Sequence, residues 1–406
     1  MQDNEKKPAL RFKGFTDPWE QRKLKELYFQ LTERNADLLP YQKTLSVATM
    51  SFKTDGNGAV DTSLANYKRL RTGDIAFEGH TSKEFRYGRF VLNDVGDGIM
   101  SPRFSALRPL HEMPINFWKY YIHYEPIMRK VLVNSTKAGT MMNELVINEF
   151  LQESILVPSV AEQQAIGRFF KQLDTLITLH QRKYEKLVNI KKSMLDKMFP
   201  KNGASVPEIR FKGFTDPWEQ RKLEEYLEVS GQKNFEGIYT KEDVLSVSGD
   251  FGIVNQIEFQ GRSFAGASVA NYGVVETGDI VYTKSPLKSN PYGIIKANKG
   301  KNGIVSTLYA VYKPKQSANP EFVQIYFEQD ARMNNYMHPL VNKGAKNDMK
   351  VSAENALKGQ IVFPDIKEQR TISEFFHNLD TLITLHQRKL EKLQNIKKSC
   401  LEKMFV

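Results

Sequence analysis

The chain has 406 residues, of which 40% are hydrophobic, so it is long enough for two to four globular domains and too apolar to be disordered. Its single cysteine, Cys400, excludes an intramolecular disulfide framework and a cysteine-based zinc site, and we expect neither a membrane span nor a signal peptide, because no long apolar run or apolar leader is present. These features favour a cytoplasmic protein, and the net charge of +11 is compatible with an anionic partner such as nucleic acid.

The main feature of the sequence is an internal repeat. Residues 8–24 (PALRFKGFTDPWEQRKL) recur as residues 207–223 (PEIRFKGFTDPWEQRKL), and residues 162–199 match residues 368–405 at 28 of 38 positions. The segments between these blocks share only short motifs. We interpret the pattern as one fold present twice, with a common framework and different target surfaces. Neutral drift after an old duplication is the alternative explanation.

The repeat divides the chain into six segments. In chain order we expect an N-terminal framework segment (1–24), a first mixed α/β domain (25–161), a first long helix (162–199), a linker with the repeated framework segment (200–223), a second mixed α/β domain (224–367) and a second long helix (368–406).

Both mixed domains contain the same turn motifs in the same order. Each follows the tetrapeptide Asp-Pro-Trp-Glu, at residues 17–20 and 216–219, which fits either a helix start with proline in its first turn or a turn into a strand. Each also contains a Thr-Gly-Asp turn before a short apolar run. We predict strands at 75–77, 280–282 and 304–312, and helices at 116–130 and 320–337.

The repeated C-terminal blocks predict two long amphipathic helices. Ser159 and Asp365 fit N-caps, and Glu162 and Glu368 follow three residues later, as in a capping box. Apolar residues then recur every three or four positions over about 38 residues in each copy. The seam residues that we select are Leu173, Ile177, His180, Leu187, Met194, Leu379, Ile383, His386, Leu393 and Cys400.

A helix of this length needs a partner for its apolar stripe, and the other copy is the obvious one. If an approximate two-fold axis relates the halves, the two helices pair antiparallel as a coiled coil. Two separate helices, each packed on its own domain, are the alternative. We interpret His180 and His386 as polar contacts that fix the register of the pair rather than as metal ligands.

No catalytic motif is present in the sequence. There is no phosphate-binding loop, no dinucleotide-binding glycine motif and no His-Glu-x-x-His metal motif. Basic residues gather instead after each Gly-Asp-Ile strand, around a Tyr-Gly pair, where they suit phosphate positioning and base reading. A solvated basic loop is the alternative. The residues that we assign to DNA contact are Arg69, Arg71, His80, Lys83, Arg86 and Arg89 in the first half, and Lys284, Lys288, Asn290, Lys296, Lys299 and Lys301 in the second.

The ordered motifs resemble the specificity subunit of type I restriction–modification systems over essentially the whole chain. They are a Trp-Glu-x-x-x-Leu segment (19–24 and 218–223), the Gly-Asp-Ile turn, a Gly-Ile-x-Ser strand, and a Pro-x-x-x-Glu-Gln-x-x-Ile entry into each long helix (158–166 and 364–372). The resemblance implies an α+β chain with two pseudo-symmetric mixed α/β target-recognition domains, joined by two long antiparallel coiled-coil helices.

The resemblance also implies a function. Each target-recognition domain would read one part of a split, asymmetric site on double-stranded DNA. The helices would separate the domains and bind two modification (methyltransferase) subunits, which carry S-adenosylmethionine and methylate adenine, and restriction subunits that use ATP and Mg would join them. The chain itself would hold no metal or cofactor and would not be an enzyme. A coiled-coil adaptor that bridges two protein partners, and a self-contained DNA enzyme, are the alternatives from other classes.

Overall fold

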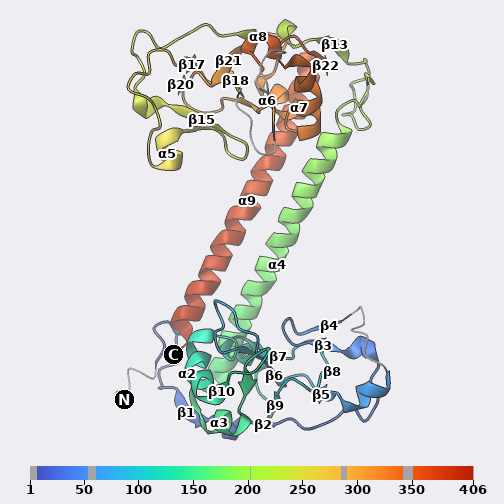
Figure 1. Cartoon of the computed structure of the whole chain (residues 1–406), viewed down its shortest axis with the longest axis vertical. Coiled ribbons are helices and arrows are strands. Elements are labelled where there is room, and N and C mark those ends of the chain that lie inside the picture. Colours follow the sequence, from blue (N-terminus) through green and yellow to red (C-terminus); the bar gives the residue numbers. More distant parts are fainter. Residues whose placement is uncertain (1–6, 54–60, 202, 285–289, 342–350, 406) are drawn as a thin grey trace. The chain divides into compact units, whose positions relative to one another are not determined.

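The computed structural model describes residues 7–53, 61–201, 203–284, 290–341 and 351–405, and it divides the chain into two compact units. Unit 1 comprises residues 1–181 and 388–406, and unit 2 comprises residues 182–387. Two long helices, α4 (Val160–Lys197) and α9 (Ile366–Met404), each contribute one part to each unit (Figure 1). Each unit therefore combines one globular domain with the beginning of one long helix and the end of the other.

Unit 1 is built around a four-stranded antiparallel sheet with the strand order β2-β9-β6-β7. The central strand β6 is buried at all four positions, as its apolar run Ile-Ala-Phe predicts. The elements of this domain are β1 (Glu20–Lys23), β2 (Tyr28–Gln30), β3 (Leu45–Ser46), β4 (Ser51–Phe52), β5 (Lys68–Leu70), β6 (Ile75–Glu78), β7 (Arg89–Leu92), β8 (Gly98–Met100), β9 (Ala106–Pro109), α1 (Ile115–Tyr121), α2 (Glu125–Ser135), β10 (Thr136–Lys137), β11 (Glu144–Leu145), α3 (Ile147–Gln152) and β12 (Ser154–Val157).

Unit 2 repeats the same sheet with the order β14-β21-β18-β19, and its central strand β18 is likewise fully buried. Small two-stranded sheets recur too, because β13 pairs with β22 as β1 pairs with β12. Its elements are β13 (Glu219–Lys222), β14 (Leu227–Val229), β15 (Leu245–Ser248), β16 (Gly252–Asn255), α5 (Gln256–Gln260), β17 (Gly273–Val275), β18 (Ile280–Thr283), β19 (Ile295–Ala297), β20 (Gly303–Val305), β21 (Tyr309–Pro314), α6 (Pro320–Tyr326), α7 (Asp330–Met337), α8 (Ala353–Ala356) and β22 (Gln360–Phe363).

Three predicted elements differ from the structure. The apolar run 304–312 is interrupted by a turn between β20 and β21, and each of the predicted helices 116–130 and 320–337 is broken into two. The Asp-Pro-Trp-Glu segments are turns into the strands β1 and β13, so the helix-start interpretation was wrong. The break between α1 and α2 is local in origin, because Pro126 lies in the first turn of α2 and cannot continue the preceding helix.

The Gly-Asp-Ile and Tyr-Gly motifs form turns at the two ends of the central strand of each sheet. Gly73 and Gly278 adopt positive φ values of 96° and 92°, and the carboxylates of Asp74 and Asp279 each accept a backbone N–H three residues earlier at 2.7 Å. Gly293 packs so closely that a Cβ atom there would lie 1.9 Å from the carbonyl oxygen of Thr283. These glycines therefore fix the turns that start and reverse the central strand.

Both long helices begin as the sequence predicts, with one exception. The hydroxyl of Ser159 and the carboxylate of Asp365 accept backbone N–H groups of the first turn. The exception concerns Glu162 and Glu368. Their backbone N–H groups make the capping-box bond to Ser159 and Asp365, but their carboxylates bind an arginine of the preceding framework segment. Arg11 and Arg210 hold these carboxylates through two hydrogen bonds of 2.7 Å each.

The long helices pair antiparallel in each unit. In unit 1 the Phe170 and Phe405 rings lie 5.7 Å apart and Lys397 forms an ion pair with Asp174 at 2.7 Å. Unit 2 repeats both contacts at equivalent positions, with Phe199 against Phe376 and Lys191 against Asp380. Figure 1 shows the two helices side by side. In the part of the chain that the structure describes, neither these nor the shorter helices have an apolar stretch that could cross a membrane.

Candidate nucleic-acid interface

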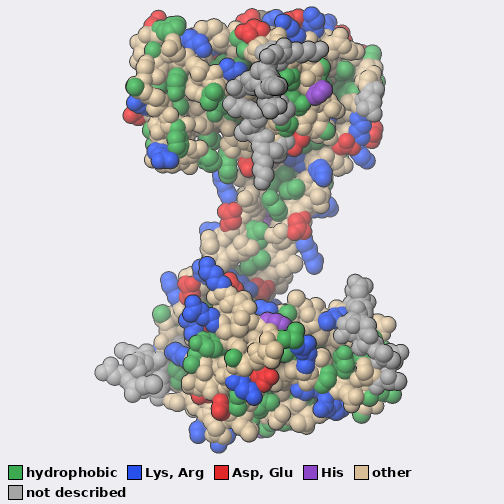
Figure 2. Space-filling model, viewed as in Figure 1, with side chains coloured by type: hydrophobic (Ala, Val, Ile, Leu, Met, Phe, Trp, Pro, Cys, Tyr) green, Lys and Arg blue, Asp and Glu red, His purple; other side chains and the backbone are tan. Residues whose placement is uncertain are grey.

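The basic cluster of the first half lies around the hairpin formed by β6 and β7. Lys83 and Arg86 are exposed in its loop and form no ion pair with any described residue. Arg89 and His80 instead converge on the buried carboxylate of Glu78, with His80 in a short hydrogen bond. The hairpin thus holds one arginine and one histidine against its own strand and leaves two cations on its surface (Figure 2 shows such Lys and Arg side chains scattered over both units).

Two other predicted DNA contacts of this half are tied to acidic neighbours. Arg69 lies on β5, 3.3 Å from Asp97, and Arg71 donates to Glu33 at 2.9 Å. The Arg69 side chain is only 13% exposed, whereas that of Arg71 is 58% exposed. Arg71 is therefore the more accessible of the two for an external phosphate.

In the second half the predicted residues divide between surface and interior. Lys284 is half-buried at the end of β18, where burial and the charge of Lys233 lower its pKa, and Lys301 is exposed. Lys299 is exposed and forms an ion pair with Glu321 at 3.2 Å. These cations lie on segments that follow the buried central strand, as the sequence predicts. Lys288 lies outside the described residues.

The other two residues selected in this half are buried. Asn290 is 9% exposed and donates to Asp330 at 2.6 Å, which joins the chain after β18 to the start of α7. Lys296, on β19, is 7% exposed, and burial lowers its pKa. Both side chains are therefore buried in the folded domain, and neither is exposed on its surface in this structure.

Buried asparagines hold the framework in both halves, and sequence reasoning missed them. The amide of Asn35 donates to the carbonyls of Leu39 and Leu64, and Asn234 makes the equivalent bonds in unit 2. Asn93 and Asn298 likewise each donate to two loop carbonyls beside the Gly-Asp-Ile turn. Aligning the two halves at offsets of 199 and 205 residues would have revealed both pairs.

The predicted seam residues all lie on α4 and α9. All of them are buried or half-buried: Leu173, Ile177, His180, Leu187, Met194, Leu379, Ile383, His386, Leu393 and Cys400. Cys400 belongs to the core of unit 1 together with Met404 and Phe405. Among the described residues, no group of three His, Cys, Asp or Glu side chains is suited to hold a metal ion.

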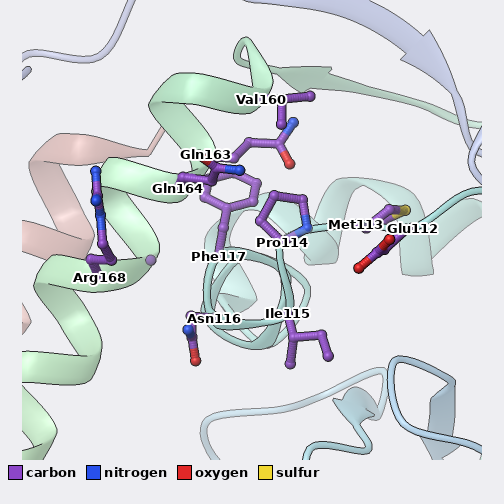
Figure 3. Close-up of a pocket in the computed structure, with 11 residues that line it drawn as sticks. Glu112, Met113, Pro114, Ile115, Asn116, Phe117, Val160, Gln163, Gln164 and Arg168 are labelled. Atoms are coloured by element: carbon purple, nitrogen blue, oxygen red, sulfur yellow. The ribbon is translucent and has the colours of Figure 1, made fainter.

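A cavity of about 610 Å³ lies in unit 1 where α1 approaches the first turns of α4 (Figure 3). Pro114, Ile115 and Phe117 line one side, and Gln163 and Arg168 line the other. Gly167 permits this approach, because a Cβ atom there would lie 2.7 Å from the backbone nitrogen of Phe117. The lining of this cavity contains no pair of facing carboxylates and no nucleophile with a base, so nothing in the cavity indicates catalysis.

Known proteins similar to this chain include one sequence relative and two solved structures. The chain is 22% identical over 422 residues to a putative type I restriction enzyme specificity subunit, MjaX, of Methanocaldococcus jannaschii, and the match covers 94% of this chain and 91% of that protein. The crystal structure of the type I restriction–modification S subunit from M. genitalium superposes with a TM-score of 0.55 at 14% identity, over 98% of this chain and 99% of that one. The HsdS subunit from Thermoanaerobacter tengcongensis has a TM-score of 0.45 at 18% identity, over 95% and 96% of the two chains. No family model matches the chain.

The sequence relative and the solved S-subunit fold confirm the resemblance to type I specificity subunits that the repeated motifs predicted. The fold class is confirmed as well: two pseudo-symmetric mixed α/β domains are combined with two long helices that pair antiparallel in each unit.

Proposed function

We propose that this chain is the non-catalytic DNA-recognition subunit of a type I restriction–modification complex and that each unit reads one half of a bipartite, asymmetric site. The observation that carries the proposal is a framework whose side-chain contacts are repeated beneath loops whose exposed residues differ. The buried amides of Asn35 and Asn234 make equivalent hydrogen bonds, and Asp174 and Asp380 make equivalent ion pairs with Lys397 and Lys191. Identical scaffolds with different surfaces are expected of two readers with different targets. Residues 25–161 and 224–367 are the proposed reading domains.

The helices offer the same surface twice to the partners of such a complex. Leu176 and Leu179 are 43% and 46% exposed on α4, and their equivalents Leu382 and Leu385 are 44% and 47% exposed on α9. Because exposed leucines repeated in register suit protein docking, we assign this strip to two copies of a methylating subunit. S-adenosylmethionine would be bound by those copies, and ATP and Mg by restriction subunits.

Sequencing of modified adenines in cells with and without this chain tests the proposal. The expected result is adenine methylation at one motif of two defined parts separated by a spacer, present only when the chain is expressed. Methylation that is identical in both strains, while the partner subunits are expressed, would refute it.

An adaptor that bridges two proteins without reading DNA is the second candidate, and exposed aromatic residues of unit 2 favour it. Phe235, Phe251 and Phe264 are 70%, 66% and 55% exposed. Fluorescence anisotropy of labelled duplexes with the assembled complex separates the two functions. A DNA reader prefers one duplex sequence over its scrambled version, whereas an adaptor shows no difference between them.

A further inference from the structure

One surface turn occupies the same place in both units. In unit 1 the backbone N–H of Phe104 donates to the carbonyl of Ser101 at 3.3 Å, and in unit 2 that of Tyr309 donates to Ser306 at 3.0 Å. The four-residue sequences are Ser-Pro-Arg-Phe and Ser-Thr-Leu-Tyr, displaced by 205 residues. The framework therefore keeps the first residue of the turn, an aromatic ring at its end, and the hydrogen bond between them.

The two central positions of the turn are exposed and differ between the units. Arg103 occupies the third position in unit 1, and Leu308, which is 58% exposed, occupies it in unit 2. The strands on both sides, β8 and β20 before the turn and β9 and β21 after it, are largely buried. The sheet thus presents two variable side chains at equivalent points in each half.

Arg103 is oriented but not neutralised. Its guanidinium lies 5.8 Å from the centre of the Phe104 ring and 3.9 Å from the sulfur of Met141, and it forms no ion pair with a described carboxylate. Its Nη2 group donates to the sulfur of Met141, and no described carboxylate holds the rest of the guanidinium. An arginine in this setting can form a bidentate hydrogen bond with an external acceptor.

Each turn is attached to the basic segment of its own half. The N–H of Phe77, on β6, donates to Ser105 at 2.8 Å, and the N–H of Lys284, after β18, donates to Leu308 at 3.0 Å. In unit 1 the ammonium of Lys68 also donates to the carbonyl of Phe104 at 2.6 Å. The turn therefore lies beside cations that can position a phosphate backbone, where base edges would follow.

We propose that this turn is a base-reading position in each unit, with Arg103 recognising a guanine and Leu308 contacting a thymine methyl group in the major groove. This deepens the proposed function and rests on it. Guanine presents two acceptors, O6 and N7, that match the arginine fork, whereas leucine has no hydrogen-bonding group and can only distinguish bases by an apolar contact. The same scaffold would then read different base pairs in the two half-sites.

The test uses the full chain assembled with its methylating partners and the motif measured by adenine-methylation sequencing. Duplexes carrying each of the four base pairs at every motif position are ranked by affinity for the wild type and for Arg103→Ala, Arg103→Lys, Leu308→Ala and Leu308→Arg. We expect Arg103→Ala to lose preference for one G·C pair in one half-site by roughly 5- to 150-fold, with the other half-site unchanged. Arg103→Lys should keep part of the affinity and lose most of that preference, and Leu308→Arg should create a G·C preference in the other half-site.

Lys83→Ala is the matched control, because a phosphate contact should weaken binding to every duplex equally. If Arg103→Ala behaves like Lys83→Ala, or leaves the ranking of duplexes unchanged at an unaltered melting temperature, the inference is wrong. That outcome differs from failure of the proposed function itself, in which the wild-type complex would show no sequence preference at all.

Discussion

Buried charges are of two kinds in this chain. Glu162 and Glu368 are each 1% exposed, and each receives two hydrogen bonds from an arginine of the repeated framework segment. Lys296 is also buried but forms no ion pair with any described residue. Removing one partner of a buried ion pair leaves the other charge uncompensated, whereas removing a buried charge that has no ion pair relieves its desolvation cost. Substitutions at the two kinds of site should therefore change the free energy of unfolding in opposite directions.

Glu162→Gln should destabilise unit 1, because the substitution leaves Arg11 largely buried without its counter-charge. We expect the free energy of unfolding to fall by about 3–5 kcal/mol. Urea denaturation followed by circular dichroism measures it. The control is Glu20→Gln in the exposed pair with Arg22, which should change stability by less than about 1 kcal/mol. Equal effects of the two substitutions would show that burial of the Arg11 pair does not matter.

Lys296→Met should stabilise the protein, because it removes an ammonium group whose pKa is lowered mainly by burial. The unfolded chain binds more protons than the folded one between the lowered pKa and the usual value of 10.5, so the wild type gains stability as the pH rises through that interval. The advantage of the variant should therefore be largest at neutral pH and shrink toward pH 10.5. A lower melting temperature for Lys296→Met at pH 7 would show that the lysine makes a favourable contact.

At the scale of elements, the helix seam is the feature most open to disruption. Leu187→Asp together with Leu393→Asp places a carboxylate at a half-buried position of each long helix that we predict to lie on the seam. Full burial of a leucine is worth roughly 1.5–3 kcal/mol. We expect a lower melting temperature and reduced helical circular dichroism. In the assembled complex, binding to the full DNA site should weaken more than binding to each half-site.

Val188→Asp is the matched control for the seam, since Val188 neighbours Leu187 but is 38% exposed on the same helix. It should change the melting temperature little. If the seam double variant melts like the control and binds the full site normally, the helix pair does not act as the spacer.

Structural features that depend on residues close in sequence could be predicted, whereas features that depend on contacts between distant segments could not. The long helices could be predicted because their three-and-four spacing persists over many turns and their caps are local. The turn that carries Leu308 could not, because residues 304–312 contain no glycine or proline to mark a break, and Ser306 and Thr307 alone do not distinguish a turn from a strand. The burial of Lys296 and the pairing of Glu162 with Arg11 depend on contacts between segments distant in sequence, which no local pattern encodes.

At the scale of the whole molecule, the repeat makes the two proposed reading domains independent. Each has its own sheet and its own core, and each framework segment binds the helix that its own domain precedes. A change confined to one domain should therefore leave the specificity of the other intact, because no part of its core is altered.

Replacing residues 25–161 with the corresponding segment of a relative, followed by adenine-methylation sequencing, measures this independence directly. We expect a motif in which one half-site is new and the other is identical to that of the unmodified chain. A motif changed in both halves, or in neither while methylation persists, would contradict the reading of one half-site by each unit.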